Sequence, residues 1–268
     1  MNPPTATALE PAKALVSVRP FTADDVSDPI LKGPYGFEVN DHCQTCNLRR
    51  NGFFCQLTAP ALKDFDALKF VSAYPQGAVL FIEKQISRGV YVLCEGEVKL
   101  SISSREGKTL ILRIVKPGDV LGLAGTLVDM PHEVTAETMR PSQVAFVRRD
   151  AFLRFLTRHP EGYPAVAKQL AAHYQVACEQ LRTLALSASA QGRLAKMLLD
   201  FSTARQGTKQ GARFNWSLTH DEIGTLIGTT RETVTRTLSA FRRRSLVTLQ
   251  GSSLLILDRA ALESLAAA

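Results

Sequence analysis

The chain has 268 residues, of which 45% are hydrophobic, and a net charge of +7. This length suits about two domains with a sizeable core, and no apolar run is long enough to span a membrane. The N-terminus, MNPPTATALEPAKALV, lacks the charged start and apolar core of a secretory signal. We therefore expect a cytoplasmic protein with no membrane partner.

Residues 1–40 contain many prolines and glycines and little periodicity, which predicts a flexible N-terminal arm. A cysteine module follows at 41–58, where three of the five cysteines crowd together: Cys43, Cys46 and Cys55. Three thiolates can hold an iron–sulfur cluster if a fourth ligand comes from elsewhere, and zinc would also suit them. Alternatively, Phe53 and Phe54 dock the arm on the core, and the thiols are free or form a disulfide under oxidation.

Residues 59–159 are expected to form a sensor domain. A short helix, APALKDFDALKF, precedes a series of brief strands separated by glycine-containing turns, which is typical of an antiparallel β roll, barrel or sandwich. Cys94 shares a strand face with Val90 and Val92, so we expect a buried core thiol. The expected strands are Val71–Tyr74, Ala78–Ile82, Val90–Cys94, Glu97–Ser103, Thr109–Val115, Glu133–Ala136 and Gln143–Val147.

A long helix is predicted within residues 160–187, beginning after Pro164. Apolar residues recur along it every three or four positions, as in a coiled-coil seam. We interpret this stripe as a homodimer seam, with intramolecular core as the alternative; His173 and Cys178 are expected at the helix surface or seam. The predicted seam consists of Val166, Leu170, Tyr174, Ala177, Leu181 and Leu184.

Residues 188–268 hold 11 Lys and Arg against 6 Asp and Glu, a surplus of +5. An amphipathic helix at Gly192–Phe201 and a polar loop, ARQGTKQGARFNW, lead to a helix pair at Leu218–Val247. A hairpin around Gly251-Ser252-Ser253 and a small helix at Arg259–Ala267 close the chain. Helix pair plus hairpin predicts a winged helix-turn-helix, and the basic surplus fits a phosphate backbone partner.

The helix pair carries the most specific functional pattern in the sequence. Thr219 can cap the first helix in a capping box with Glu222, Gly228 breaks it, and Thr230 caps the second. On the second helix Val234, Leu238 and Phe241 share one face, and five polar residues share the other: Arg231, Glu232, Thr235, Arg236 and Ser239. Such a helix suits a DNA major groove, because arginine can bond guanine and glutamate can accept from cytosine. The alternative is an ordinary amphipathic helix pair with solvated charges.

The order of β roll, long helix and winged helix-turn-helix resembles the CRP/FNR superfamily of bacterial transcription regulators. The resemblance covers roughly Asp41 to the C-terminus, and two stretches carry it: GVYVLCEGEVKLSISSREGKTLILRIVKPGDVLGLAGTL and DEIGTLIGTTRETVTRTL. It implies an α+β chain with a cyclic-nucleotide-binding-like antiparallel β roll, a long dimerisation helix and a C-terminal winged helix-turn-helix.

By this resemblance Arg231, Glu232 and Arg236 would read a TGTGA-like half-site in palindromic double-stranded DNA. Glu232 and Arg236 are also spaced to form an i,i+4 pair. The implied partners are a second copy of the chain, DNA and RNA polymerase. The expected contacts to the DNA backbone are Thr219, Thr230, Thr235, Ser239, Arg242 and Arg243, with Arg244 adding charge.

The resemblance also bears on the signal. Cyclic-AMP binders of the superfamily carry a Gly-Glu pair followed by an Arg-Ser pair that binds the phosphate. In this chain His132-Glu133 stands in place of the Arg-Ser pair. Because Glu133 would repel a phosphate, cyclic AMP is not expected. The FNR branch holds an oxygen-labile iron–sulfur cluster on N-terminal cysteines, which Cys43, Cys46 and Cys55 resemble, with a wider gap before the third. Its fourth cysteine would fall near Ala145. A carboxylate, Cys94 or Cys178 could substitute, or the chain binds no cluster.

We therefore expect a homodimeric DNA-binding regulator controlled by a redox or oxygen signal at the cysteine module. The alternative is a small-molecule effector in the β-roll cavity, with structural or zinc-binding cysteines. An enzyme is not expected, because neither Cys43 nor Cys55 has a His–Asp/Glu partnership at useful spacing.

Overall fold

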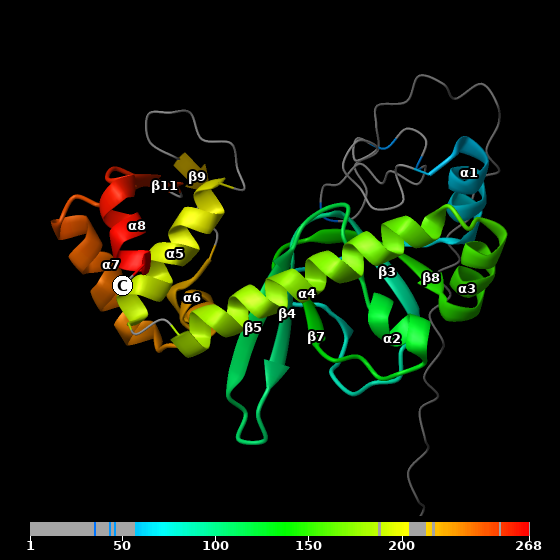
Figure 1. Cartoon of the computed structure of the whole chain (residues 1–268), viewed down its shortest axis with the longest axis horizontal. Helices are drawn as coiled ribbons and strands as arrows, with labels where there is room; N and C mark the ends of the chain where they lie inside the picture. The colour runs from blue at the N-terminus through cyan, green and yellow to red at the C-terminus, as the bar shows by residue number, and fades with distance from the viewer. Residues whose placement is uncertain are drawn as a thin grey trace, which may run out of the picture.

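A computed structural model describes residues 35, 43, 46, 57–186, 189–203, 213–215, 218–251 and 253–267. The predicted arm, apart from Tyr35, and Cys55 with its neighbouring phenylalanines lie outside the described residues. One long helix runs along an N-terminal β roll and reaches a C-terminal helical domain at its far end (Figure 1). The α+β architecture expected from the sequence is confirmed.

The roll consists of two four-stranded antiparallel sheets. One has the order β1-β8-β3-β6 and the other β2-β7-β4-β5. Alternate residues of β3 face opposite ways: Val90 packs toward the helices, whereas Leu93 packs into the space between the sheets. The strands are β1 Phe70–Tyr74, β2 Val79–Phe81, β3 Gly89–Glu95, β4 Val98–Ser103, β5 Thr109–Val115, β6 Val120–Leu121, β7 Thr135–Thr138 and β8 Ser142–Arg148.

All seven expected roll strands are present: β5 has the expected bounds, and the other six have shifted ends. The largest shift is in β7, which begins at Thr135 rather than Glu133, because the preceding chain bonds to the β2–β3 connection: Lys84 N donates to His132 O at 2.8 Å. The sequence reading missed β6 and the short helix α2, Leu123–Val128. Both are too short to show a periodic pattern.

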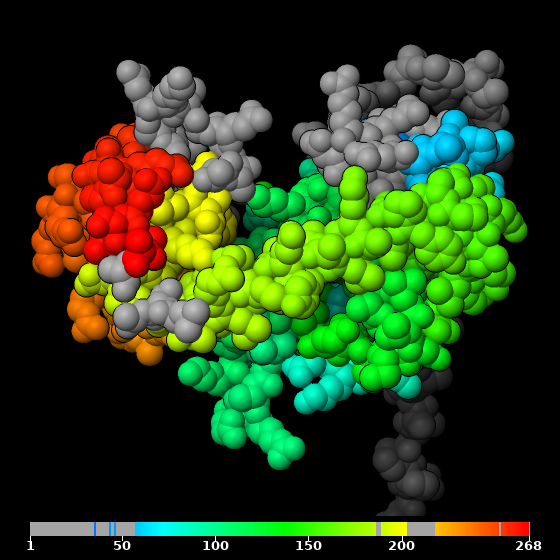
Figure 2. All heavy atoms as spheres, in the orientation of Figure 1, coloured from blue at the N-terminus to red at the C-terminus, as the bar shows by residue number. Residues whose placement is uncertain are grey.

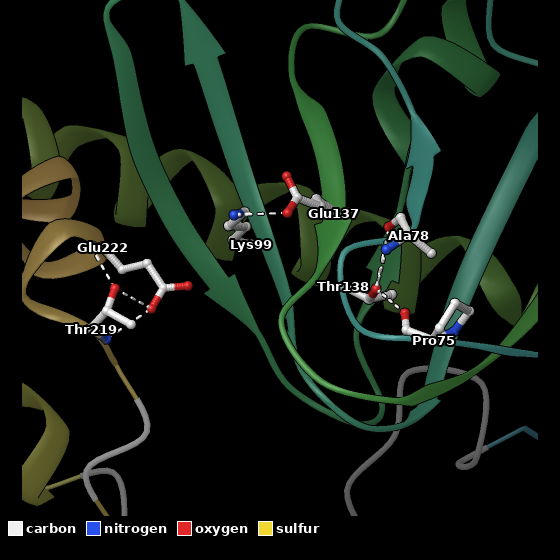
Figure 3. Close-up of polar contacts among 7 residues, drawn as sticks. All are labelled: Pro75, Ala78, Lys99, Glu137, Thr138, Thr219 and Glu222. Atoms are coloured by element: carbon white, nitrogen blue, oxygen red, sulfur yellow. Dashed lines mark hydrogen bonds and ion pairs between the residues drawn. The ribbon is translucent and has the colours of Figure 1, made fainter. Parts of the chain in front are cut away.

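Polar contacts link β7 to its neighbours in the β2-β7-β4-β5 sheet (Figure 3). The Thr138 hydroxyl donates to Pro75 O at 2.6 Å and accepts from Ala78 N at 2.8 Å, which ties β7 to the turn before β2. Lys99 on β4 pairs with Glu137 on β7 at 3.0 Å. These contacts hold the sheet from which β5 reaches the C-terminal domain.

Three helices cover the outer face of the β1-β8-β3-β6 sheet. They are α1 Ala59–Leu68, α3 Arg149–Arg158 and the start of α4 Gly162–Leu186, and their core includes Phe65, Phe152 and Phe155. Helix α4 begins at Gly162, before Pro164 rather than after it. A proline is tolerated there because the first turn of a helix has no intrahelical partner for its backbone N–H.

The C-terminal domain packs α5 Ala190–Thr203, α6 His220–Ile227, α7 Arg231–Arg243 and α8 Arg259–Ala267 around one apolar core. A hairpin of β10 Val247–Gln250 and β11 Ser253–Ile256 forms the predicted wing. Part of the predicted polar loop is instead a strand, β9 Arg213–Asn215, which pairs with β11. Ile114 and Met139 of the roll pack against this core, so the two domains are in contact.

Within the described part of the chain, no helix combines the length and apolar character needed to cross a membrane. Helix α4 runs across the face shown in Figure 2.

Candidate nucleic-acid interface

Helices α6 and α7 form the predicted helix-turn-helix, and its local signals appear as expected. Thr219 accepts a hydrogen bond from Glu222 N, and Glu222 accepts one from Thr219 N at 2.8 Å, which completes the capping box (Figure 3). Gly228 ends α6 with φ +64°, a left-handed conformation that favours glycine. Thr230 then caps α7 by accepting from Thr233 N. These caps fix where each helix starts and therefore which residues face outward.

Gly224 allows the two helices to approach closely. A Cβ at this position would lie 2.8 Å from Thr229 O and 3.2 Å from the carbonyl carbon of Thr230, both backbone atoms. Thr229 N also donates to Gly224 O at 2.8 Å. The turn between the helices is thus held against α6, and the start of α7 has a defined position.

The outer face of α7 carries uncompensated positive charge. Val234, Leu238 and Phe241 are buried in the core, as predicted. All five residues predicted for the opposite face are exposed, and Arg242 to Arg244 continue it. Within the described residues, no arginine of this face, from Arg231 to Arg244, forms an ion pair.

Arginines elsewhere behave differently. Most of those in the roll and along α4 and α8 pair with a carboxylate at up to 3.5 Å, as Arg113 does with Asp119 and Arg259 with Glu263. The further examples are Arg140, Arg148, Arg149, Arg154, Arg158 and Arg182. The α7 face therefore stands out as a surface whose cations are available to an external polyanion.

Glu232 is the acidic residue of that face, and one expectation about it is wrong. Within the described residues it forms no ion pair with Arg236. The pKa of its carboxyl is lowered by its own backbone N–H and by the Thr230 side chain, with a smaller effect of the Arg231 charge. Glu232 is held at the helix N-terminus, because a carboxylate there meets unsatisfied backbone N–H groups. It remains ionised and able to accept hydrogen bonds.

The hydroxyl groups predicted to touch the DNA backbone are engaged within the protein. Thr219 donates to Glu222 Oε2 at 2.9 Å and Thr230 to Thr233 Oγ1 at 3.2 Å. Thr235 and Ser239 donate to the carbonyl oxygens of Arg231 and Thr235, each at 2.9 Å. A phosphate oxygen needs a donor, so these hydroxyl protons would have to reorient before bonding one.

His220 is a residue of this surface that sequence reasoning missed. Its Nδ1 lies 2.8 Å from Thr235 Oγ1, which ties the first residue of α6 to the outer face of α7. The signal available in the sequence was its place directly after the N-cap, Thr219.

The long helix is coupled to this site. Gln180 Nε2 of α4 donates to Leu226 O at 2.8 Å, and Arg193 Nε of α5 donates to Ile227 O at the same distance. Both bonds satisfy carbonyl groups at the C-terminal end of α6. Leu184 lies beside the turn, with its Cδ2 2.8 Å from where a Cβ on Gly228 would be.

The predicted dimer seam is partly wrong. Val166 is 5% exposed and belongs to the roll core, Leu170 packs against that core, and Leu184 contacts the helix-turn-helix. Tyr174 and Leu181 are 72% and 67% exposed, and Ala177 is exposed as well. The residues that share the outer face at alternating spacings of four and three are Ala167, Ala171, Tyr174, Cys178, Leu181 and Ala185, which we call the α4 stripe.

His132, which stands where the resemblance placed the Arg-Ser pair of cyclic-AMP binders, is part of an aromatic stack. His132 is 3% exposed and stacks on Phe81, with ring centroids 3.9 Å apart. Burial lowers the pKa of the His132 imidazole, against a smaller opposing effect of Glu133. Gly122 borders His132, and Leu123 after it is buried.

Cys43 lies in a polar contact with Lys69 and Asp66. Lys69 Nζ donates to Cys43 Sγ at 3.1 Å and pairs with Asp66 at 2.6 Å, although the Lys69 side chain is only 5% exposed. Burial raises the pKa of the Cys43 thiol, and Lys69 opposes this. Burial also disfavours ionisation of Asp66, but Lys69 and the backbone N–H of Cys43 lower the pKa of that carboxyl to about 2.

Cys94 occupies an informative position. It is half-buried rather than fully buried, and it lies near the backbone of Ala145, the residue close to which the family resemblance placed the absent fourth cysteine. The pKa of the Cys94 thiol is raised to about 12, mainly by burial, with the Lys69 charge opposing this and the nearby Cys43 and Cys46 adding smaller contributions. Cys178, the other cysteine considered as a fourth ligand, is distant in sequence from Cys94 and lies on the α4 stripe.

Thiolates are suitable ligands for an iron–sulfur cluster, and Cys43 and Cys46 lie close enough to Cys94 to affect the pKa of its thiol. However, among the described residues no three His, Cys, Asp or Glu side chains converge as metal ligands. Cys55 lies outside the described residues. The described residues alone therefore do not form a complete cluster site.

Two family descriptions match the chain. "Cyclic nucleotide-binding domain" matches residues 71–159, and "Crp-like helix-turn-helix domain" matches residues 192–265. These spans correspond to the roll with α3 and to most of the C-terminal domain.

Similar proteins include the "CRP-like cAMP-activated global transcriptional regulator" of Mycobacterium tuberculosis, 30% identical over 187 residues, or 69% of this chain and 83% of the relative. The cAMP-activated global transcriptional regulator CRP of Salmonella typhimurium is 24% identical over 74% of this chain and 95% of its own length. Among solved structures, FixK2 from Bradyrhizobium japonicum has a TM-score of 0.66 and 22% identity, covering 75% of this chain and 98% of its own.

Proposed function

We propose a function from one premise: the chain belongs to the CRP/FNR family of DNA-binding transcription regulators. Members of this family bind DNA and act as dimers. The proposal is that this chain is a homodimeric, sequence-specific regulator that reads two palindromic half-sites. The observation that carries it is the outer face of α7, whose arginines lack ion-pair partners within the described residues.

The base-reading residues we propose are Arg231, Glu232 and Arg236, and the half-site is TGTGA-like. Two guanidinium groups can each bond guanine O6 and N7, and the Glu232 carboxylate can accept from a cytosine amino group. Arg242 and Arg243 then contact phosphates, as do the four hydroxyl residues once their protons reorient. RNA polymerase is the proposed protein partner of the DNA-bound dimer, in the cytoplasm.

The α4 stripe is the proposed dimer interface, in place of the seam expected from the sequence. Its Tyr174 and Leu181 are large and exposed in one chain, and its spacing repeats every seven residues. A second copy packed along it would place two α7 helices in two-fold symmetry, as palindromic DNA requires.

The signal we propose is redox or oxygen, received at the cysteine module, with Cys43, Cys46 and Cys55 as cluster ligands and Cys94 as the fourth. The position of Cys94 near the Ala145 backbone, Cys43 and Cys46 supports this choice over Cys178. A cluster bound there would supply an oxygen-sensitive redox centre. The competing signal is a small-molecule effector with structural or zinc-binding cysteines. We propose that cyclic AMP is not that effector, because Glu133 would repel a phosphate and the preceding His132 is buried against Phe81 beside Gly122.

One binding experiment tests the function. A fluorescent duplex with two TGTGA-like half-sites is titrated with protein prepared anaerobically, against a duplex of the same composition with scrambled half-sites. We expect tighter binding to the palindrome. Equal affinity for both duplexes would contradict sequence-specific readout.

The same preparation tests the signal. Iron and sulfide content, together with visible absorbance that bleaches in air, would support the cluster. A colourless protein without iron, or one that contains zinc, would remove it and leave the effector hypothesis.

A further inference from the structure

A cavity of about 390 Å³ lies between the roll and the C-terminal domain. Strand β5 and its following turn form one wall, α4 a second, and α5 with α6 the third. Its apolar lining includes Ile114, Val176, Met197, Phe201, Leu226 and Ile227. This volume falls within the range of small-molecule sites, which are mostly apolar with a few placed polar groups.

Arg113 distinguishes this cavity from a simple packing defect, because it places there a buried hydrogen-bond donor that is unsatisfied among the described residues. Its Nη2 bonds Asp119 at 3.0 Å, but its Nε is buried and has no hydrogen-bond partner within the described residues. Buried polar atoms nearly always have a partner, so such an exception calls for an explanation, and an unseen acceptor is one. Burial lowers the pKa of the Arg113 guanidinium, while Asp119 opposes this effect.

The charges around the cavity indicate where an acceptor would sit. Glu97 and Asp119 are each paired with an arginine, Arg140 and Arg113 respectively. Lys116 lines the same wall as Arg113, is exposed, and forms no ion pair within the described residues. The α5 wall carries Asp200 together with two cations that are already engaged: Arg193 Nε donates to Ile227 O, and Lys196 pairs with Glu179. Among the described residues, the unsatisfied Arg113 Nε and the unpaired Lys116 both lie on the β5 wall, so a negatively charged group is favoured there.

We propose that this cavity binds a small amphipathic organic anion, with its apolar body among Val176, Met197 and Leu226 and its acidic group on Arg113 Nε and Lys116. The site is separate from the roll interior, where His132 stacks on Phe81. Such a ligand contacts both domains at once. It stabilises this arrangement of the helix-turn-helix relative to the roll over any other, since a ligand shifts populations by its differential affinity.

The binding claim stands without DNA, so its failure and that of the proposed function are distinguishable. The probe is 8-anilinonaphthalene-1-sulfonate, which joins an apolar body to one anionic group. N-phenyl-1-naphthylamine has the same body without the sulfonate and tests the role of charge. Fluorescence titrations with the full chain give the affinity and the number of sites.

Two variants probe the cavity from different walls. Arg113→Gln removes the guanidinium, and Val176→Trp fills the cavity from α4 at a position already 39% exposed, where folding should tolerate it. The matched controls are Arg105→Gln at the exposed tip of the β4–β5 hairpin and Val79→Trp on the exposed side of β2. Urea unfolding checks that every variant is folded.

We expect one sulfonate site per chain, at least tenfold weaker in Arg113→Gln and lost in Val176→Trp, with both controls unchanged. The uncharged probe should bind the wild-type chain about as weakly as the sulfonate binds Arg113→Gln. Absence of saturable binding, or unchanged affinity in folded Val176→Trp, would overturn the site. Unchanged affinity in Arg113→Gln would overturn the assignment of the anion to that residue.

Discussion

Replacing Gly224 by alanine separates the folding of the helix-turn-helix from its ability to present α7. Alanine is intrinsically better in a helix, by up to about 1 kcal/mol. Its Cβ, however, would lie 2.8 Å from Thr229 O, and overpacking against atoms that cannot rotate away costs about 1–3 kcal/mol. The net destabilisation is therefore about 1 kcal/mol. Domains are typically stable by about 5–15 kcal/mol, so Gly224→Ala should remain folded.

The effect on DNA should be larger than the effect on stability. To relieve the overlap, the turn and the start of α7 must shift by several tenths of an ångström, and Arg231 and Glu232 stand in that first turn. A lost bidentate base contact costs about 1–3 kcal/mol, and about 1.4 kcal/mol corresponds to a factor of ten in affinity. We expect at least tenfold weaker binding to the palindromic duplex.

Gly107→Ala is the matched control. Gly107 has φ +80° in the β4–β5 hairpin, and nothing lies within 4 Å of a Cβ there. Its left-handed conformation should cost alanine about 1–2 kcal/mol, similar to the cost at Gly224 but far from α7. Urea unfolding and fluorescence anisotropy on both variants complete the comparison. If Gly224→Ala binds the palindrome like the wild-type chain, the close approach does not position α7 and the reasoning fails.

The remaining predictions concern base readout, the dimer and pH. Arg236→Ala should lose about 1–3 kcal/mol and relax the preference at one base, whereas Arg243→Ala should weaken binding to all duplexes alike; equal, sequence-blind losses would refute the assignment. Leu181→Glu places a charge on the α4 stripe and should give a monomer in sedimentation; a persisting dimer would exclude the stripe as the interface. Burial, with a smaller effect of Arg113, lowers the pKa of His173 to about 4. The unfolded chain therefore takes up that proton first, so stability should fall as pH drops from about 6.5 to about 4. The urea midpoint of His173→Gln should vary less over this range, and an unchanged pH dependence would contradict it.

Features set by neighbouring residues could be predicted from the sequence. Thr219 with Glu222, Gly228, and Thr230 each act within a few residues, so the bounds of α6 and α7 follow from local chemistry. The roll strands are similarly separated by glycine turns.

Features set by distant parts of the chain could not be predicted in this way. The apolar spacing of α4 cannot say that Val166 meets the roll core while Tyr174 meets solvent, because both obey the same period. Strand β9 exists because β11 supplies its hydrogen-bond partners from about 40 residues later. Likewise, the neighbourhood of Cys94 and Ala145 arises from the pairing of β3 with β8, two strands far apart in sequence.

The hydrogen bond from Gln180 to Leu226 O limits which insertions the chain can accept in α4. Gln180, which forms this bond to α6, lies between Cys178 and Leu181 of the α4 stripe on the same continuous helix. Each residue added to a helix turns everything beyond it by about 100° and advances it by about 1.5 Å. One residue inserted between Tyr174 and Gln180 would therefore turn α7 by about 100° relative to the roll and to the first half of the α4 stripe. Seven residues, close to two full turns, would nearly restore the phase. The length of α4 is thus constrained by rotation. The β4–β5 hairpin has no such constraint, because nothing in the described part of the chain lies within 4 Å of a Cβ on Gly107 at its tip, so its length can vary.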